Sequence, residues 1–365
     1  MRIGIDARPL IEKKTGIGFY LYYLLINILE NDRENEYILF SDRTVYFDSI
    51  KYDNLQIVVD KDSKLKKSLW YLLRIRKLCA EYEIDVFWGT QHVLPFNMTG
   101  VKSMLTVHDL VAFDFKETMS FYNKFLNLLL IPRSIKNADK IIAVSKSTAE
   151  RLRYHFNKYS KDKIKVIYED VVVDKDYSSI DSEYLTKCKL CENKYIMFLG
   201  TIEPRKNIIT LINALDKINK ETGMKLLICG KYGWNCDIEK KLIEENKDKI
   251  VFLNYVTDSE KNYLMNKAFA FVFPSLYEGF GLPVLEALRN NTISIVADNT
   301  SLKELIEEES LRFKTLDSEE LANKIILLYK DKELYRRGLE YCSKREKDFE
   351  WNDISKEYIN QLCNI

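Results

Sequence analysis

The sequence predicts an α/β protein made of two doubly wound, Rossmann-like parallel-sheet domains that face each other across a cleft. Short apolar runs alternate with stretches of helical periodicity along most of the 365 residues, which is the pattern of parallel strands covered by helices. The alternation stops in a polar stretch at residues 174–193 and then starts again. A chain of this length is also long for one hydrophobic core, so two domains are expected.

We place the first domain at residues 1–175. Its strands are expected at residues 2–6, 37–41, 55–59, 86–88, 103–107 and 140–144, and its helices at 18–29, 66–81, 121–136 and 147–154. The helices repeat apolar residues at intervals of three and four, whereas the strands are short continuous apolar runs. This alternation predicts a parallel sheet with helices on its faces.

We place the second domain at residues 193–345. Its strands are expected at residues 195–199, 225–229, 250–253, 268–273 and 292–297, and its helices at 208–219, 237–245, 259–266, 302–307, 317–330 and 332–345, with another starting at Pro283. The last segment, 349–365, contains Trp351 and an amphipathic helix at 354–362. By itself this pattern says only that a terminal helix packs on some surface.

The composition favours an intracellular globular protein. The 56 basic and 55 acidic residues give a net charge of +1, which offers no global attraction for nucleic acid. No run approaches the ~18–20 apolar residues that cross a membrane, and the N-terminus begins a strand rather than a secretory signal. The seven cysteines are scattered, which predicts free thiols and a cytoplasmic location. Cys188 and Cys191 have metal-like spacing, but no second pair completes a zinc site.

The most informative segment spans residues 273–286, where a buried strand enters a glycine loop that leads directly into a helix. Pro283 suits the first helical position because its missing N–H would lack a partner there anyway. The amides of Phe280, Gly281 and Leu282 would then point outward at a helix N-terminus, an arrangement that binds anions. We therefore expect these three residues to contact a phosphate group.

Two carboxylates, Glu278 and Glu286, frame this loop. Carboxylates repel phosphate but accept hydrogen bonds from sugar hydroxyls, so the segment predicts a ligand that carries both groups. The alternative is an ordinary tight connection between strand and helix, with acidic residues placed favourably near the helix start.

Three further loops follow expected strands, where ligands bind in parallel sheets. Arg205 and Lys206 precede a helix, and a bound diphosphate would offset their unfavourable position near its N-terminus. His108 could donate to a sugar hydroxyl or a phosphate oxygen. Gly16 and Gly18 would let the backbone approach a ligand closely. The alternatives are solvated charges, a structural histidine and a simple turn.

These segments resemble the retaining glycosyltransferases of family 4, which have the GT-B fold. The resemblance rests mainly on a Glu-x7-Glu motif at Glu278 and Glu286 and on the loop at residues 200–207, and it extends from residue 4 to Trp351. It implies that Glu278 holds hydroxyls of the donor sugar and that Glu286 holds the ribose. It assigns the donor diphosphate to Lys206 and, with Thr201 replacing the arginine of many members, to Arg205.

The same resemblance implies roles for the remaining candidates. His108 would lie by the donor sugar and the leaving phosphate, and Gly16 and Gly18 would lie near the diphosphate and the acceptor. Phe280, Gly281 and Leu282 would bind the diphosphate or the sugar through their amides, and the last helix would cross back onto the first domain. No metal or other cofactor would be required.

The resemblance is strongest to bacterial mannosyl- and rhamnosyltransferases that build surface polysaccharide. It implies transfer of a sugar from a nucleotide-sugar donor to a saccharide or polyprenyl-linked acceptor, with retention of the anomeric configuration. Two alternatives on the same fold are a nucleotide-sugar epimerase and a non-catalytic scaffold subunit. A hydride-transfer enzyme is disfavoured because Leu21 stands where the dinucleotide motif has its third glycine.

A basic stretch at residues 64–78 contains interleaved leucines and Trp70. It could rest on the anionic cytoplasmic face of a membrane, which would suit a lipid-linked acceptor. The alternative is a packed domain helix with solvated lysines, and the sequence favours that alternative.

Overall fold

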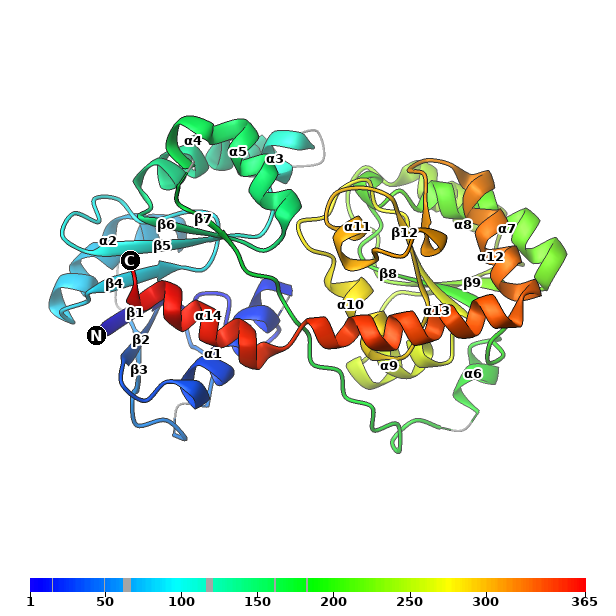
Figure 1. Cartoon of the computed structure of the whole chain (residues 1–365), viewed down its shortest axis with the longest axis horizontal. Coiled ribbons are helices and arrows are strands. Elements are labelled where there is room, and N and C mark those ends of the chain that lie inside the picture. Colours follow the sequence, from blue (N-terminus) through cyan, green and yellow to red (C-terminus); the bar gives the residue numbers. More distant parts are fainter. Residues whose placement is uncertain (15, 49, 62–66, 116–120, 161, 182) are drawn as a thin grey trace. The chain divides into compact units, whose positions relative to one another are not determined.

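The computed structural model describes residues 1–14, 16–48, 50–61, 67–115, 121–160, 162–181 and 183–365. These residues form two compact units (Figure 1). Unit 1 comprises Met1–Val171 together with Phe349–Ile365, and unit 2 comprises Val172–Asp348. The break between the units therefore precedes the polar stretch at 174–193, and the terminal segment belongs to unit 1.

Unit 1 contains a seven-stranded sheet in which all neighbouring strands are parallel, in the order β3-β2-β1-β4-β5-β6-β7. The strands are β1 (Arg2–Asp6), β2 (Glu36–Ser41), β3 (Leu55–Val59), β4 (Val86–Gly89), β5 (Lys102–Val107), β6 (Lys140–Ala143) and β7 (Ile164–Val166). The helices are α1 (Gly16–Asn31), α2 (Lys67–Glu81), α3 (Val111–Asp114), α4 (Phe121–Asn137), α5 (Lys146–Ser160) and α14 (Trp351–Cys363).

Helices cover both faces of this sheet. Buried side chains of α2, α4 and α5 form one hydrophobic cluster with the strands, and buried side chains of α1 and α14 form a second cluster. Strands that are buried on both faces read as continuous apolar runs, which explains why they were recognisable in the sequence. The two shortest elements, α3 and β7, were not predicted because three or four residues carry too little periodicity.

Unit 2 contains a six-stranded parallel sheet in the order β10-β9-β8-β11-β12-β13. The strands are β8 (Tyr195–Leu199), β9 (Lys225–Cys229), β10 (Ile250–Leu253), β11 (Ala270–Phe273), β12 (Ser294–Ala297) and β13 (Arg312–Phe313). The α-helices are α6 (Tyr184–Lys187), α7 (Ile208–Thr222), α8 (Asp237–Glu245), α9 (Asp258–Asn266), α10 (Leu282–Arg289), α11 (Leu302–Leu305), α12 (Ser318–Lys330) and α13 (Lys332–Arg345). Three single turns of 3₁₀ helix are η2 (Pro204–Lys206), η3 (Glu309–Leu311) and η4 (Glu346–Asp348).

The strand order in each sheet reverses direction beside the first strand of the unit. In unit 2 the chain moves from β8 outward to β10 and then crosses back to β11, on the other side of β8. Loops that leave the carboxyl ends of β8 and β11 therefore diverge around a crevice, which is where ligands bind in doubly wound sheets. The topology thus selects the loops after β8 and β11 as the candidate site of unit 2.

The terminal helix α14 completes the core of unit 1, where it packs beside α1 (Figure 1). Trp351, Tyr358 and Leu362 are buried against α1 and the sheet. The hydroxyls of Tyr20 and Tyr358 are hydrogen-bonded, and the backbone N–H of Trp351 donates to Oδ2 of Asp170 at 3.2 Å. Helix α14 is therefore part of the unit 1 core even though unit 2 separates it from α1 in the sequence.

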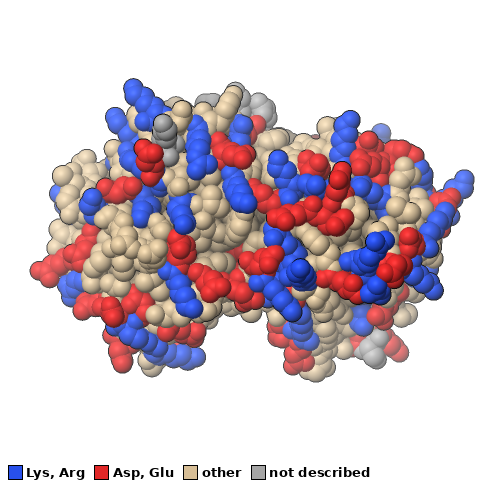
Figure 2. Space-filling model, viewed as in Figure 1, with Lys and Arg blue, Asp and Glu red and all other residues tan. Residues whose placement is uncertain are grey.

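Charged residues of both signs are interspersed over the face drawn in Figure 2. Because neighbouring charges of opposite sign cancel at short range, this face presents no extended field of one sign.

We predict that Leu362→Ala lowers the free energy of unfolding of unit 1 by about 2–5 kcal/mol, because it leaves a cavity in a close-packed core. Three of the four tryptophans, Trp70, Trp88 and Trp351, lie in unit 1, so denaturant unfolding followed by tryptophan fluorescence reports on it. The control is Leu327→Ala on α12, where the leucine is 53% exposed and little change is expected. Equal effects of the two variants would contradict a core role for α14.

Candidate active site

Three charged side chains meet at the carboxyl ends of β8 and β11. Nζ of Lys206 donates to Oε1 of Glu278 at 2.6 Å, and Nη1 of Arg205 lies 3.2 Å from the same oxygen. Arg205 also donates to the carbonyl of Tyr277 and to Oε1 of Glu203, both at 2.6 Å. The structure therefore brings together three of the residues that the sequence predicts for the site.

This cluster is buried, with side-chain exposure of only 11–14% for Glu278, Lys206 and Arg205. Burial by itself raises the pKa of the Glu278 carboxyl, but the charges of Lys206 and Arg205 outweigh burial and bring the pKa below its ordinary value. Glu278 is therefore an anion at neutral pH. Removing one partner of such a buried pair costs roughly 3–5 kcal/mol, because the other charge is left without compensation.

Neighbouring loops hold the backbone around this cluster. Nδ2 of Asn207, which is left-handed at φ 51°, donates to the carbonyl of Pro274 at 3.0 Å. Oγ of Ser301 donates to the carbonyl of Glu278 at 3.0 Å, and the N–H of Glu278 donates to Oγ1 of Thr300 at 3.3 Å. The loops after β8, β11 and β12 thus support one another, which fixes the position of the Glu278 carboxylate.

Helix α10 begins one residue earlier than the sequence suggests. Leu282 is its first residue and Pro283 its second, with Gly281 as the N-cap in a left-handed conformation at φ 115°. A Cβ on Gly281 would lie 2.9 Å from a methyl group of Leu305, so both the φ value and the packing require glycine. Phe280 is buried beside it. The predicted loop residues Phe280, Gly281 and Leu282 therefore sit at the start of α10.

Glu286 lies one turn into α10, where it meets a lysine from α9. Nζ of Lys261 is 3.0 Å from Oε2 of Glu286 and 3.1 Å from Oδ1 of Asp258. Lys261 and Glu286 expose only 18% and 19% of their side chains. Burial lowers the pKa of Lys261, but the charges of Glu286 and Asp258 outweigh it and raise the pKa above its ordinary value, so the ammonium stays protonated.

In unit 1, His108 follows β5 and is buried. Its Nδ1 lies 2.8 Å from Oε1 of Glu169, and its Nε2 lies 3.0 Å from the carbonyl oxygen of Thr90. A carbonyl and an ionised carboxylate only accept hydrogen bonds, so both ring nitrogens must donate and the ring must be an imidazolium. Burial lowers the pKa of His108, but the hydrogen bond and charge of Glu169 outweigh it and raise the pKa.

The pairing of His108 changes what this histidine can do. The sequence suggests donation to a sugar or phosphate oxygen, but both donors are committed to Glu169 and Thr90 inside unit 1. In this arrangement His108 supplies a fixed positive charge at the carboxyl end of β5, and direct donation to a ligand would require one of these hydrogen bonds to break. Asp109 accepts from the N–H of Val111 at 3.0 Å and so orders the start of α3.

His92 lies beside His108, with ring centroids 5.6 Å apart. Burial lowers the pKa of His92 to about 4 against the opposing charge of Asp109, and His108 lowers it further. His92 is therefore neutral at pH 7. Its backbone is left-handed at φ 30°, a strained conformation for a residue other than glycine. Within the described ranges, its Nδ1 is enclosed without a hydrogen-bond partner.

Gly16 and Gly18 lie in the first turn of α1 rather than in a loop before it. A Cβ on Gly18 would lie 2.7 Å from the carbonyl oxygen of Pro9, so close approach of the chain to itself requires this glycine. Thr15, which precedes the pair, lies outside the described residues. The structure thus supplies a packing reason for Gly18, whereas a ligand-binding role for either glycine stays a prediction.

Sequence reasoning missed Glu169, Lys261 and the buried ion pair of Arg8 with Asp6. Arg8 donates to Asp6 through Nε at 2.8 Å and Nη2 at 2.7 Å, and its guanidinium stacks 3.5 Å from the centroid of the Tyr71 ring. A signal was present for Lys261, since a cation near a helix N-terminus opposes the helix dipole and needs a partner. For Glu169, the only signal was an acidic pair directly after an apolar run.

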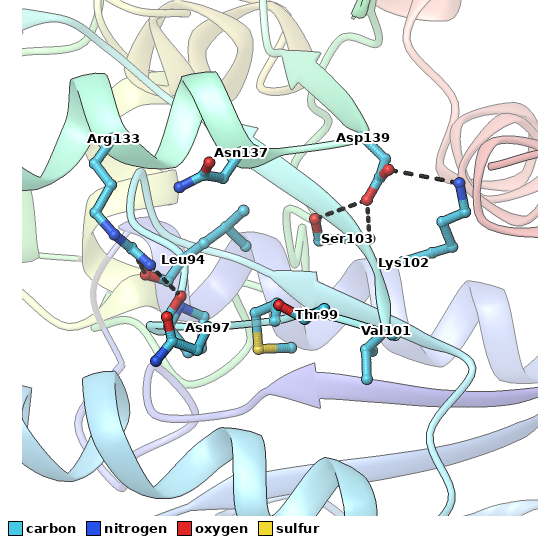
Figure 3. Close-up of a pocket in the computed structure, with 12 residues that line it drawn as sticks. Leu94, Asn97, Thr99, Val101, Lys102, Ser103, Arg133, Asn137 and Asp139 are labelled. Carbon is cyan, nitrogen blue, oxygen red and sulfur yellow. Dashed lines mark hydrogen bonds and ion pairs between the residues drawn. The ribbon is translucent and has the colours of Figure 1, made fainter.

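A cavity of about 570 Å³ lies elsewhere in unit 1 (Figure 3). It is lined by the chain that enters β5 and by the end of α4, including Asn97, Ser103, Arg133 and Asp139. This is the amino edge of β5 and β6, whereas His108 follows the carboxyl end of β5. The cavity is therefore separate from the candidate residues of unit 1.

We predict that Glu169→Gln makes unit 1 less stable in a pH-dependent way. Because the pKa of His108 is raised by folding, the pair contributes fully below the unfolded pKa of about 6.5 and less as pH rises through the folded pKa. The loss in unfolding free energy should be about 1.5–3 kcal/mol near pH 6 and should shrink toward pH 9. Denaturant unfolding across this range measures it, with the exposed Glu12→Gln as control. A loss that is independent of pH would contradict an imidazolium at His108.

Comparison with known proteins agrees with the fold and with the placement of these residues. Residues 16–174 match the family model described as Glycosyltransferase Family 4, and residues 189–345 match the model described as Glycosyl transferases group 1. The chain is 28% identical to the O-antigen chain mannosyltransferase RfbU of Salmonella typhimurium, over 82% of this chain and 83% of that protein. It is 27% identical to O-antigen chain mannosyltransferase B of Escherichia coli, over 99% of each.

Solved structures show the same fold. Sucrose-phosphate synthase from Thermosynechococcus elongatus superposes with a TM-score of 0.74 at 20% identity, covering 100% of this chain and 98% of that one. HepE of Anabaena, solved in complex with UDP and glucose, superposes with a TM-score of 0.70 at 17% identity, covering 100% and 99%. With its two Rossmann-like units, its two matched domains and these relatives, the chain belongs to the GT-B glycosyltransferases, as a member of glycosyltransferase family 4.

Proposed function

We propose that this glycosyltransferase moves a mannose- or rhamnose-like sugar from a nucleotide-sugar donor to a saccharide or lipid-linked saccharide, with retention of the anomeric configuration. The observation that carries the proposal is the buried cluster of Arg205, Lys206 and Glu278 at the carboxyl ends of β8 and β11. Two cations and one carboxylate in one place suit a ligand with a diphosphate and a hydroxylated sugar. The O-antigen mannosyltransferases among the relatives support the sugar class.

Each charged group has a defined task in this proposal. The bond between the anomeric carbon and the diphosphate oxygen breaks, and its electron pair leaves with the diphosphate. Arg205 and Lys206 stabilise that developing charge in a buried site, where electrostatic stabilisation is strong. Glu278 accepts hydrogen bonds from donor-sugar hydroxyls, and Glu286 accepts from the ribose. The acceptor oxygen bonds to the same face of the sugar, and its proton passes to the leaving phosphate oxygen.

We also propose that the reaction needs no metal or other cofactor. Arg205 and Lys206 place two positive charges beside Glu278, which is the neutralising role that a divalent cation plays in other phosphate sites. His108 adds a third buried positive charge at the carboxyl end of β5 in unit 1.

For the acceptor, we propose a polyprenyl-linked saccharide at the cytoplasmic face of a membrane. One relative, 24% identical over 82% of this chain, is a Campylobacter jejuni enzyme whose name specifies a diphospho-undecaprenol acceptor. No helix within the described part of the chain is long and apolar enough to cross a membrane. Contact with lipid would therefore have to be peripheral.

Helix α4 provides a surface for such contact. Phe125 and Leu129 are each 60% exposed, and Leu128 is 37% exposed on the same face. The helix contains Lys124 and Lys136 but no acidic residue. In the basic stretch at 64–78, Trp70 and other apolar residues are buried in the unit 1 core, and residues 64–66 lie outside the described ranges. We therefore place the membrane contact on α4 rather than on α2.

We predict that Glu278→Ala and Lys206→Ala each lower kcat/KM for sugar transfer by at least about 10²-fold while the fold survives, because each removes charge from the reacting site. The assay mixes a nucleotide-sugar with a lipid-linked acceptor and reads the anomer of the product by NMR. The control is Lys247→Ala, where the lysine is 75% exposed. Unchanged turnover in both site variants would remove these residues from the active site. An isomerised nucleotide-sugar without acceptor-linked product would instead indicate an epimerase.

We predict that the double variant Phe125→Ser and Leu129→Ser binds vesicles containing anionic lipid at least about tenfold more weakly than the natural chain. Inserting each apolar side chain into lipid is worth about 1.5–3 kcal/mol, and the serines forgo that gain. Co-sedimentation with phosphatidylglycerol vesicles measures binding, and Leu327→Ser in unit 2 is the control. Equal binding of all three proteins would rule out α4 as the contact surface.

A further inference from the structure

Lys261 is an unusual neighbour for a ribose-binding carboxylate. Its ammonium lies between Glu286 and Asp258, at 3.0 Å and 3.1 Å, with only 18% of the side chain exposed. An equivalent pair with the same spacing stands on α8, where Asp237 and Lys240 are also 3.1 Å apart, but there the lysine is 47% exposed. Lys261 thus lies in the proposed donor site, whereas Lys240 is an ordinary surface ion pair.

The surroundings of Lys261 leave binding capacity unused. Oε2 of Glu286 is enclosed and has no well-directed hydrogen bond from any described residue, although Lys261 is close. An ammonium has three N–H donors, and the two carboxylates occupy at most two of them. The Asp258 side chain is 71% exposed, so its carboxylate is open to a ligand. The cluster therefore offers one cationic donor and one anionic acceptor side by side, next to Glu286.

The geometry points to a guanine nucleotide as the donor: we propose that Asp258 and Lys261 read the edge of a guanine base whose ribose is held by Glu286. This inference rests on the proposed function, since it takes the nucleotide-sugar as substrate and Glu286 as the ribose ligand. The base is attached directly to the ribose, so groups beside Glu286 are the ones that meet it.

Hydrogen-bond chemistry selects guanine over the other bases. Guanine presents two adjacent donors, N1–H and the exocyclic N2 amino group, beside the acceptor O6. A carboxylate can accept two parallel hydrogen bonds, and only guanine among the common bases offers two neighbouring donors to Asp258. The flexible four-carbon stem of Lys261 lets its ammonium donate to O6 while it stays near Glu286.

Titration calorimetry of the full chain with GDP, IDP, UDP and ADP tests this assignment. IDP lacks the 2-amino group but keeps O6, so the natural chain should bind GDP about tenfold or more tightly than IDP, and should bind UDP and ADP more weakly still. Asp258→Ala should bring GDP and IDP to the same affinity. Lys261→Met should weaken GDP and IDP by about tenfold each and leave ADP unchanged.

The α8 variants Asp237→Ala and Lys240→Met are matched controls and should behave like the natural chain. If Lys261→Met fails to fold, Asp258→Ala carries the test, because its side chain is largely exposed. Binding of UDP or ADP as tightly as GDP, or a GDP preference over IDP that survives Asp258→Ala, would overturn the guanine assignment and leave the glycosyltransferase proposal standing. Failure of all four nucleotides to bind would overturn the donor site itself.

Discussion

The compensation of one buried carboxylate, Glu278, is the constraint on which the site of unit 2 depends. An uncompensated charge at this depth would be strongly unfavourable, so Lys206 and Arg205 must lie against it. Because the two cations follow β8 and Glu278 follows β11, this pairing also joins the loops on either side of the crevice. The position of the site and the closure of the sheet edge are therefore consequences of the same interaction.

The same ion cluster explains how the site can serve a charged ligand. In the free protein, Glu278 satisfies the two cations, and the cations keep Glu278 ionised. A diphosphate brings new negative charge to Arg205 and Lys206, and sugar hydroxyls bring new donors to Glu278. The charged groups are thus positioned in advance, which is what electrostatic stabilisation of a leaving anion requires.

Unit 1 uses a related device with a different result. Glu169 holds His108 as a cation by accepting from Nδ1, while the Thr90 carbonyl accepts from Nε2. The neighbouring Asp170 accepts from the N–H of Trp351, the first residue of α14. Two adjacent acidic residues at the end of unit 1 therefore fix both a buried imidazolium and the start of the terminal helix.

The sequence by itself determined the two parallel-sheet units and most of their strands and helices, because doubly buried strands and amphipathic helices leave strong apolar patterns. It also determined Glu278, Glu286, Lys206 and Arg205 as candidates, because each follows a strand within a glycine- or proline-marked loop. These features are local, and a local pattern is enough to reveal them.

Only the tertiary structure decided which of these charges meet. The partners of His108 and Glu286 are Glu169 and Lys261, which lie 61 and 25 positions away in the chain and share no motif with them. The protonation of His108 follows from two acceptors contributed by separate loops, and the place of α14 follows from packing against α1, the most distant helix in the sequence. Such contacts depend on how the sheets order their strands, and one-dimensional periodicity carries no information about that order.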